Sequence, residues 1–135
     1  MKKLLILSVL AGLGGCAALE PPAGTPTPAT PVFFQPFSAA LDQPALNNIA
    51  SAAKAANAQP DVPVTVIGSA DSVGSAKANK YLSETRAQVV ADQLAADGVA
   101  QDRLRIHARG IIQPTIEAPG TPVQAARRVL IEIGG

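Results

Sequence analysis

Apolar and polar residues repeat along this chain with two different periods, and each change of period marks the boundary of a predicted element. Two stretches place apolar residues three and four positions apart, as on one face of a helix: residues 43–58 and 76–97. Four shorter stretches have the β-branched composition or the two-residue alternation of strands: residues 32–35, 62–68, 103–110 and 127–133. This order predicts an α/β (α+β) two-layer sandwich, βαβαββ, with a mixed sheet and both helices on one face.

Residues at the ends of these elements support the same boundaries. Asp42 is suited to cap the first helix, and Gly98 is suited to end the second in the left-handed conformation. Pro36 limits the first strand to an edge position or an early end, and the phenylalanines around it are expected in the core. The run at 62–68 is apolar enough for a central strand, whereas three prolines and a glycine within 111–124 predict a loop.

The second helix carries polar residues on its apolar side. Rotation by about 100° per residue places four large aliphatic side chains on one arc: Leu82, Val89, Val90 and Leu94. Three polar residues fall inside that arc, at the end nearest the preceding loop: Asn79, Ser83 and Arg86. An arginine in this position needs an anionic partner, and Asp71 in the loop, an anionic ligand, or both together supply one. The small residues of the loop at 68–75 also expose backbone N–H groups to a ligand.

The first residues predict a bacterial lipoprotein. Lys2 and Lys3 precede an apolar run at 4–13, and the sequence Leu-Gly-Gly-Cys that ends at Cys16 resembles a lipobox. We therefore predict a signal peptide at 1–15 and a lipidated Cys16. An uncleaved membrane anchor is the alternative, but spanning a bilayer takes about 20 apolar residues and the run is much shorter.

A linker and one domain follow the predicted lipid anchor. Proline, threonine and alanine dominate residues 16–31, which predicts a semi-extended linker, and the domain occupies 32–135. The residue after the cysteine is Ala17, and the aspartate that retains enteric lipoproteins in the inner membrane is missing there. By this resemblance the chain belongs in the outer membrane, lipid-anchored, with the domain facing the periplasm.

Charge and composition exclude several classes of function. The formal net charge of +1 gives no basic surplus for nucleic acid, and the 135 residues leave no room for a second core. His107 has no second nearby ligand, so we predict no metal and no cofactor. The row Arg103, Arg105, His107 and Arg109 suits an anion site or, more often, a solvated sheet face.

The motif around Asp71 resembles that of the OmpA-like domain family, which includes the peptidoglycan-associated lipoprotein. The central pattern is GxxDxxG followed by NxxLSxxRA, and the resemblance covers residues 33–133. Further matching residues lie outside this pattern: Val90, Leu94, Gly98, Val99, Arg103, Gly110, Arg127, Arg128 and Val129. The resemblance implies an OmpA-like fold and a lipoprotein member that binds the peptide stem of peptidoglycan non-covalently, through its diaminopimelate.

The resemblance also assigns roles to four residues. Asp71 corresponds to the aspartate that meets the ammonium of diaminopimelate, and Arg86 to the arginine that clamps its carboxylate. Asn79 orients the loop or the ligand, and Arg128 supports the site from the last strand. The chain departs from the family at three positions where hydrogen-bonding residues are usual: Ser69, Ala70 and Ala126. The purely structural alternative is that Asp71 and Arg86 only pin the loop to the helix.

Three functions follow as hypotheses. The first is an outer-membrane lipoprotein that tethers the membrane to the cell wall. The second is an envelope interaction or scaffold lipoprotein that acts through protein partners. The third, an enzyme, has the least support, because Ser83 lies within a helix face, His107 lies on a distant strand, and no oxyanion-type motif is present.

Overall fold

The computed structural model describes residues 27–112, 120 and 122–134. The elements are two α-helices and four strands: β1 (Thr30–Phe33), α1 (Gln43–Asn57), β2 (Val64–Ala70), α2 (Ala76–Ala96), β3 (Leu104–Ile111) and β4 (Arg128–Ile133). Two short 3-10 helices, η1 (Gln101–Arg103) and η2 (Gln124–Ala126), precede β3 and β4. The predicted signal peptide, Cys16 and most of the predicted linker lie outside the described residues.

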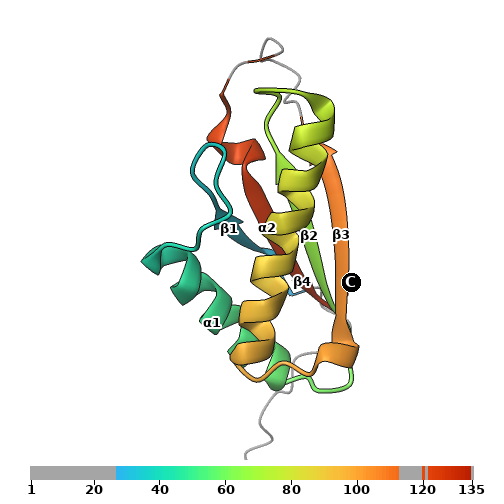
Figure 1. Cartoon of the computed structure of the whole chain (residues 1–135). Coiled ribbons are helices and arrows are strands. Elements are labelled where there is room, and N and C mark those ends of the chain that lie inside the picture. Colours follow the sequence, from blue (N-terminus) through green and yellow to red (C-terminus); the bar gives the residue numbers. More distant parts are fainter. Residues whose placement is uncertain (1–26, 113–119, 121, 135) are drawn as a thin grey trace, which may run out of the picture.

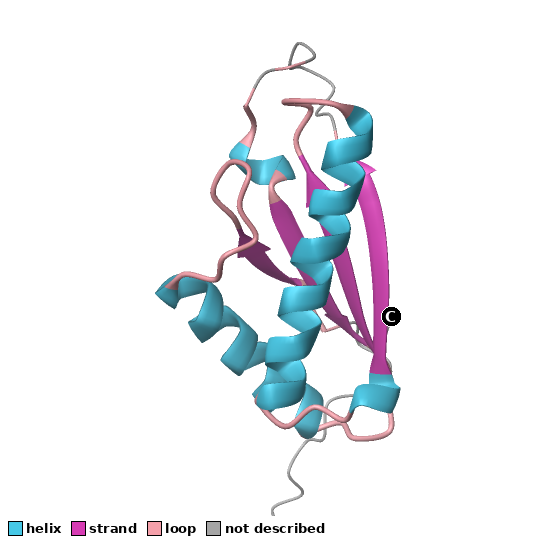
Figure 2. Cartoon of the chain, viewed as in Figure 1, coloured by secondary structure: helices cyan, strands magenta, loops and turns pink. Residues whose placement is uncertain are grey.

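The four strands form one mixed sheet in the order β1-β4-β2-β3. Strands β2 and β3 are parallel, and β4 runs antiparallel to both β1 and β2. Strand β2 is interior, as predicted from its apolar run. Strand β1 is an edge strand, as Pro36 indicated, but it begins at Thr30, two residues before the predicted start. Both helices cover one face of the sheet (Figure 1 and Figure 2), which confirms the predicted arrangement of layers.

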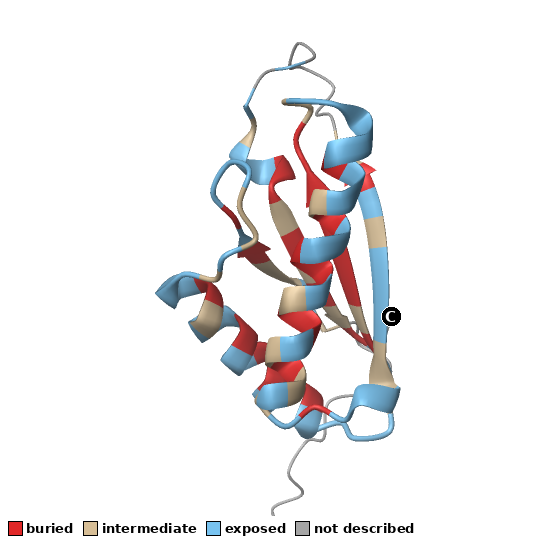
Figure 3. Ribbon diagram, viewed as in Figure 1, coloured by how far each residue is buried: buried red, intermediate tan, exposed pale blue. Residues whose placement is uncertain are grey.

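Buried residues occur on both helices and on the strands that they cover (Figure 3). Small side chains let the two layers approach closely. The predicted cap is present, because the Asp42 side chain accepts from the N–H of Ala45 at 2.9 Å. Gly68 marks the closest approach of α2 to β2, since a Cβ at this position would lie 2.0 Å from the backbone oxygen of Ser83. Gly98 ends α2 with φ +98°, as predicted. The buried apolar side chains come from both layers: Ile49, Ala52, Ala53, Val64, Val66, Ala87, Val90, Leu94, Val129 and Ile131.

Two predictions about buried residues are wrong in part. Phe34 is buried, but Phe33 is 41% exposed and Phe37 is 70% exposed, because one lies on the edge strand and the other on the loop after it. The two-residue alternation along 103–110 also places Ile106 opposite the row of Arg105 and His107, on the face expected to be buried, but this side chain is 41% exposed. Strand β3 is an edge strand, and Ile106 lines an open groove beside α2 together with Ala91.

Candidate functional site

The loop between β2 and α2 is fixed by hydrogen bonds from the start of the helix. The Ser75 side chain caps α2 by accepting from the N–H of Ala78 at 3.2 Å, and Gly74 takes a left-handed turn with φ +97°. Asn79 is buried in the first turns of α2, and its Nδ2 donates to the backbone oxygen of Val73 at 3.0 Å. Asn79 therefore holds the loop.

Asp71 is buried at the start of this loop and ties it to the segment before β4. Its Oδ2 accepts from Arg127 Nη1 at 2.9 Å and from the N–H of Val123 at 3.3 Å. Among the described residues, Oδ1 accepts only from the N–H of Val73, at 3.4 Å, close to the upper limit for a hydrogen bond. Arg127 also donates through Nε to the backbone oxygen of Phe34 at 3.3 Å, so it connects the loop to the end of β1.

Arg127 is a site residue that sequence reasoning missed. The motif contains both Arg127 and Arg128, and the prediction assigned the supporting role to Arg128 alone. Arg127 immediately precedes β4 with ψ +66°, outside the extended conformation, so strand alternation does not determine where its side chain points. Arg128 is half-buried, and its Nε is buried without a hydrogen-bond partner among the described residues.

Arg86 is fully buried, and backbone oxygens rather than Asp71 are its hydrogen-bond partners. Nε donates to Ser38 at 2.8 Å, Nη1 to Ser69 at 3.2 Å and Nη2 to Gln35 at 3.0 Å. The guanidinium carbon also lies 5.1 Å from the centre of the Phe34 ring. The direct pair between Asp71 and Arg86 that the sequence suggested is therefore wrong, because Arg127 bonds the carboxylate and carbonyls satisfy Arg86.

The charge of Asp71 still acts on Arg86 over a longer distance. Burial lowers the pKa of Arg86 from its ordinary value to about 10, the negative charge of Asp71 opposes this shift, and the positive charge of Arg127 adds to it. Arg86 therefore stays protonated at neutral pH. Its carbonyl partners come from two segments, the loop after β1 and the end of β2. The guanidinium consequently fixes the loop after β1 against the sheet.

A small pocket of about 70 Å³ opens beside Asp71. One carboxylate and four apolar residues line it: Asp71, Pro36, Phe37, Val73 and Pro122. The lining comes from three segments that are distant in sequence, namely the loop after β1, the loop after β2 and the segment before β4. A pocket of this composition suits a cationic group carried on an aliphatic chain.

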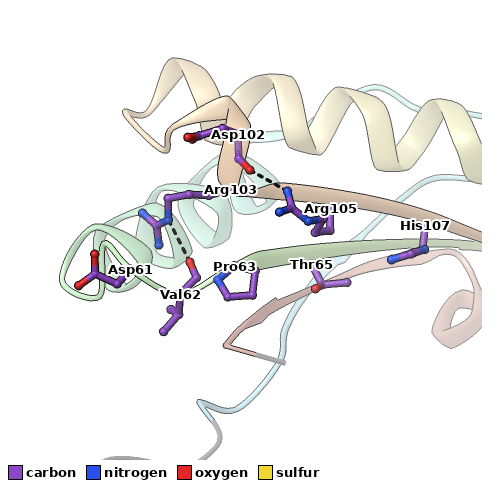
Figure 4. A pocket seen from close by; sticks show the side chains of 8 residues that line it. All are labelled: Asp61, Val62, Pro63, Thr65, Asp102, Arg103, Arg105 and His107. Atoms are coloured by element: carbon purple, nitrogen blue, oxygen red, sulfur yellow. Dashed lines mark hydrogen bonds between the residues drawn. The ribbon is translucent and has the colours of Figure 1, made fainter.

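A larger and more open pocket, of about 450 Å³, lies elsewhere on the molecule (Figure 4). It is built at the start of β2 and β3, whereas Asp71 follows the end of β2. Eight residues line it: Asp61, Val62, Pro63, Thr65, Asp102, Arg103, Arg105 and His107. Acidic and basic residues both occur there, Arg103 donates to the backbone oxygen of Val62 at 3.0 Å, and Arg105 donates to that of Asp102 at 2.7 Å. Arg105, His107 and Arg109 are exposed, in agreement with a solvated face.

We take the Asp71 pocket as the candidate site because the buried charged residues gather there. Within the described residues, no group of three or more His, Cys, Asp or Glu side chains is placed to hold a metal ion. In the same part of the chain, no helix has both the length and the apolar character needed to cross a membrane.

Sequence comparison finds relatives whose names describe peptidoglycan binding. The peptidoglycan-binding proteins ArfA of Mycobacterium tuberculosis strain H37Rv and of Mycobacterium bovis are each 37% identical to this chain over 123 residues. The aligned region covers 89% of this chain and 36% of each relative. The chain therefore spans about a third of the length of the curated relatives it matches.

Solved structures share the fold. The peptidoglycan-associated lipoprotein of Burkholderia pseudomallei superposes with a TM-score of 0.70 at 19% identity, over 77% of this chain and 89% of that one. The C-terminal domain of Helicobacter pylori MotB gives 0.67 at 25% identity, over 78% and 85% of the two chains. The OmpA-like domain of FopA1 from Francisella tularensis gives 0.65 at 25% identity, over 76% and 68%. These likenesses confirm the predicted fold class.

A model of the OmpA family matches residues 33–128 of this chain, nearly the same region as the resemblance found by motif. The match includes Asp71, Asn79, Arg86 and Arg127, so the whole candidate site lies within the family region. The match to the OmpA family and to relatives named peptidoglycan-binding proteins agrees with the prediction of a binding protein rather than an enzyme. From the family model and the 37% identical relatives together, we conclude that this chain belongs to the OmpA family.

Proposed function

We propose that this domain binds peptidoglycan non-covalently and holds the diaminopimelate of the stem peptide at the Asp71 pocket. The observation that carries the proposal is the state of the Asp71 carboxylate, which is buried beside an apolar pocket and has one oxygen with a single long hydrogen bond among residues 27–112, 120 and 122–134. Membership of the OmpA family and the peptidoglycan-binding names of the ArfA relatives support peptidoglycan as the ligand.

Asp71 is the proposed partner of the ligand's ammonium group. Arg127 and the N–H of Val123 occupy Oδ2, whereas the long contact to Val73 is the only one that Oδ1 makes within the described part of the chain. Oδ1 therefore has capacity for an N–H donor from a ligand. A hydrogen bond between two charged groups in a partly dehydrated pocket is among the stronger ones available to a protein.

The local charge balance favours a ligand that brings a carboxylate as well. Among the buried charged side chains of the site, Arg86 and Arg127 supply two positive charges and Asp71 supplies one negative charge, which leaves these three with a net charge of +1. A bare alkylammonium would raise this to +2, whereas the zwitterionic end of diaminopimelate leaves it unchanged. We propose that Arg86 attracts the carboxylate through its charge, and that Asn79 keeps the loop in place. Arg128 is the candidate hydrogen-bond donor to the ligand's carboxylate, because its Nε has no hydrogen-bond partner in the described part of the chain.

We further propose that the protein tethers the outer membrane to the wall through a lipidated Cys16 and the linker at 16–31. Thr27 lies beside Gln59, just beyond the end of α1, where Gln59 Nε2 reaches Thr27 Oγ1 at 3.5 Å. The loop that contains Asp71 lies at the opposite end of the domain (Figure 1). This separation supports a bridge in which the linker leaves from one end while the other end contacts the wall.

Co-sedimentation with purified sacculi tests the wall-binding proposal. Asp71→Asn keeps the shape of the side chain and removes its charge, so we expect the pelleted fraction to fall to background. The substitution also breaks a buried ion pair, which destabilises a protein by about 3–5 kcal/mol when one charge is left alone. Pelleting must therefore be measured at a temperature at which circular dichroism shows that the variant is folded.

Arg127→Gln is the matched control. It breaks the same ion pair but leaves the Asp71 carboxylate in place, so we expect a similar loss of stability and a much smaller loss of pelleting than for Asp71→Asn. Free diaminopimelate should compete with sacculi for the wild-type protein. If folded Asp71→Asn pellets as the wild type does, the proposed site is wrong. If wild type does not pellet, the alternative of an envelope scaffold that acts through protein partners gains support.

A further inference from the structure

We propose that Phe37 is a specificity-determining residue of the Asp71 pocket, which selects stem peptides by the length of the aliphatic chain that carries the ammonium group. The inference rests on the proposed function above and extends it to a residue that belongs to no part of the predicted site. Phe37 forms part of the apolar wall of the pocket, whereas Asp71 is the proposed partner of the ammonium group.

The position of Phe37 is the first observation. Its ring is 70% exposed, more than that of any other large hydrophobic residue in the described part of the chain, and it lines the small pocket beside Asp71. Pro36, Val73 and Pro122 complete the apolar lining. An exposed aromatic ring adds nothing to the core, and burying it against a ligand is favourable in proportion to the apolar area covered.

The backbone at Phe37 is the second observation. Among the described residues it is the only one other than glycine with a positive φ, at +54°. This conformation favours Gly or Asn, and for a bulky side chain it is an outlier that calls for a reason. Neither the left-handed backbone nor the solvent exposure of this position favours phenylalanine. We therefore interpret the ring as a group that contacts a ligand.

Buried interactions on both sides hold Phe37 in this conformation. Arg86 donates to the backbone oxygens of Gln35 at 3.0 Å and of Ser38 at 2.8 Å, which flank the residue. The N–H of Ser38 also donates to the oxygen of Gln35 at 3.3 Å and closes the turn. Because Arg86 is fully buried, its hydrogen bonds fix this turn before any ligand binds. The ring is therefore already positioned beside the pocket, and ligand binding costs little additional conformational entropy.

The size of the pocket indicates what the ring contacts. About 70 Å³ is little more than two water molecules occupy, at about 30 Å³ each. An ammonium group on Asp71 therefore fills much of the space, and the methylenes behind it lie against Phe37 and the other apolar residues. A ligand with too short a chain leaves these residues exposed or draws the ammonium away from Asp71.

The test compares two synthetic stem peptides that differ in the third residue. One carries diaminopimelate, and the other carries 2,4-diaminoglutarate, which keeps both amino acid ends and lacks two methylenes. Calorimetric titration of the full mature chain should give a dissociation constant roughly tenfold higher for the shorter ligand, from the usual contribution of two buried methylenes.

Phe37→Asn removes the ring while suiting the left-handed backbone, so we expect a melting temperature equal to or above that of the wild type. Its affinity for the diaminopimelate peptide should fall about tenfold, and the preference over the shorter ligand should shrink below about threefold. Phe33→Thr is the matched control, because Phe33 is also exposed but lies on β1 outside the pocket. It should bind as the wild type does.

The outcomes separate the inference from the function on which it rests. If Asp71→Asn abolishes binding while Phe37→Asn keeps both the affinity and the chain-length preference of the wild type, Phe37 has no role in specificity and the wall-binding proposal stands. If the wild-type chain binds neither peptide, the proposed function is wrong, and the inference fails with it.

Discussion

Arg86→Lys separates the charge of Arg86 from the geometry of its guanidinium. From the sequence alone, we expect this substitution to weaken binding while thermal stability changes little. The structure changes the second expectation, because Arg86 is the largest fully buried side chain and donates to three backbone oxygens. Lysine keeps the charge but has a single, more strongly hydrated nitrogen on a shorter stem.

The three acceptors set the size of the expected loss. They belong to Ser38, Ser69 and Gln35, and one ammonium group cannot reach all three from the position of the guanidinium. If lysine keeps one hydrogen bond, two are lost, at about 1.5–3 kcal/mol each for bonds to a charged group. We therefore expect the free energy of unfolding to fall by about 3–6 kcal/mol, which overlaps the range of about 3–5 kcal/mol for a buried charge that loses its partner.

Urea unfolding followed by circular dichroism measures this loss, and Arg103→Lys is the control. Arg103 also makes three hydrogen bonds to backbone oxygens, those of Val62, Ala56 and Gln59, but it is only half-buried. Water replaces a lost partner at such a site, so we expect a loss of about 1 kcal/mol or less. The two variants differ mainly in burial.

Two results would contradict this reasoning. Equal unfolding midpoints for Arg86→Lys and Arg103→Lys would show that the buried guanidinium contributes no more than a half-exposed one. Unchanged affinity of folded Arg86→Lys for the diaminopimelate peptide would contradict the expectation from the sequence that lysine weakens binding, and would agree with the proposal that the ligand is attracted only by the charge of Arg86.

Three further substitutions test the packing of α2 and the predicted lipidation. Gly68→Ala should destabilise the domain by about 3 kcal/mol or more, because its Cβ would lie 2.0 Å from the oxygen of Ser83 and 3.0 Å from Ala87 Cβ; an unchanged urea midpoint would contradict this. Ser83→Ala should cost about 1–3 kcal/mol in the same assay, because the buried N–H of Gly110 loses its acceptor at 3.1 Å. Cys16→Ser should abolish incorporation of labelled fatty acid, and equal labelling of both proteins would exclude the lipoprotein hypothesis.

The sequence determined the elements of this fold and their order. Local rules are enough for that, because a helix or strand reveals itself by the spacing of its apolar residues and by the residues at its ends. Asp42 and Gly98 lie where capping rules placed them, at the start of α1 and the end of α2. The helical rotation likewise predicted that Asn79, Ser83 and Arg86 face inward, and all three are buried.

The partners of the buried charges were decided by the tertiary structure. Arg86 bonds to Gln35 and Ser38, which are 51 and 48 residues away in sequence. Asp71 pairs with Arg127, which is 56 residues away. A guanidinium or a carboxylate accepts any suitable group within reach, so its choice depends on which segments the sheet order brings together. Periodicity carries no information about that order.

The exposure of individual aromatic residues was decided in the same way. Composition suggested that Phe33, Phe34 and Phe37 all lie in the core, yet only Phe34 does. The hydrophobicity of a side chain determines how much free energy is gained when it is buried. Whether neighbouring surface is available to bury it depends on the position of its strand in the sheet. Because β1 is an edge strand and Arg86 holds the loop after it, Phe37 stands beside Asp71 and not in the core.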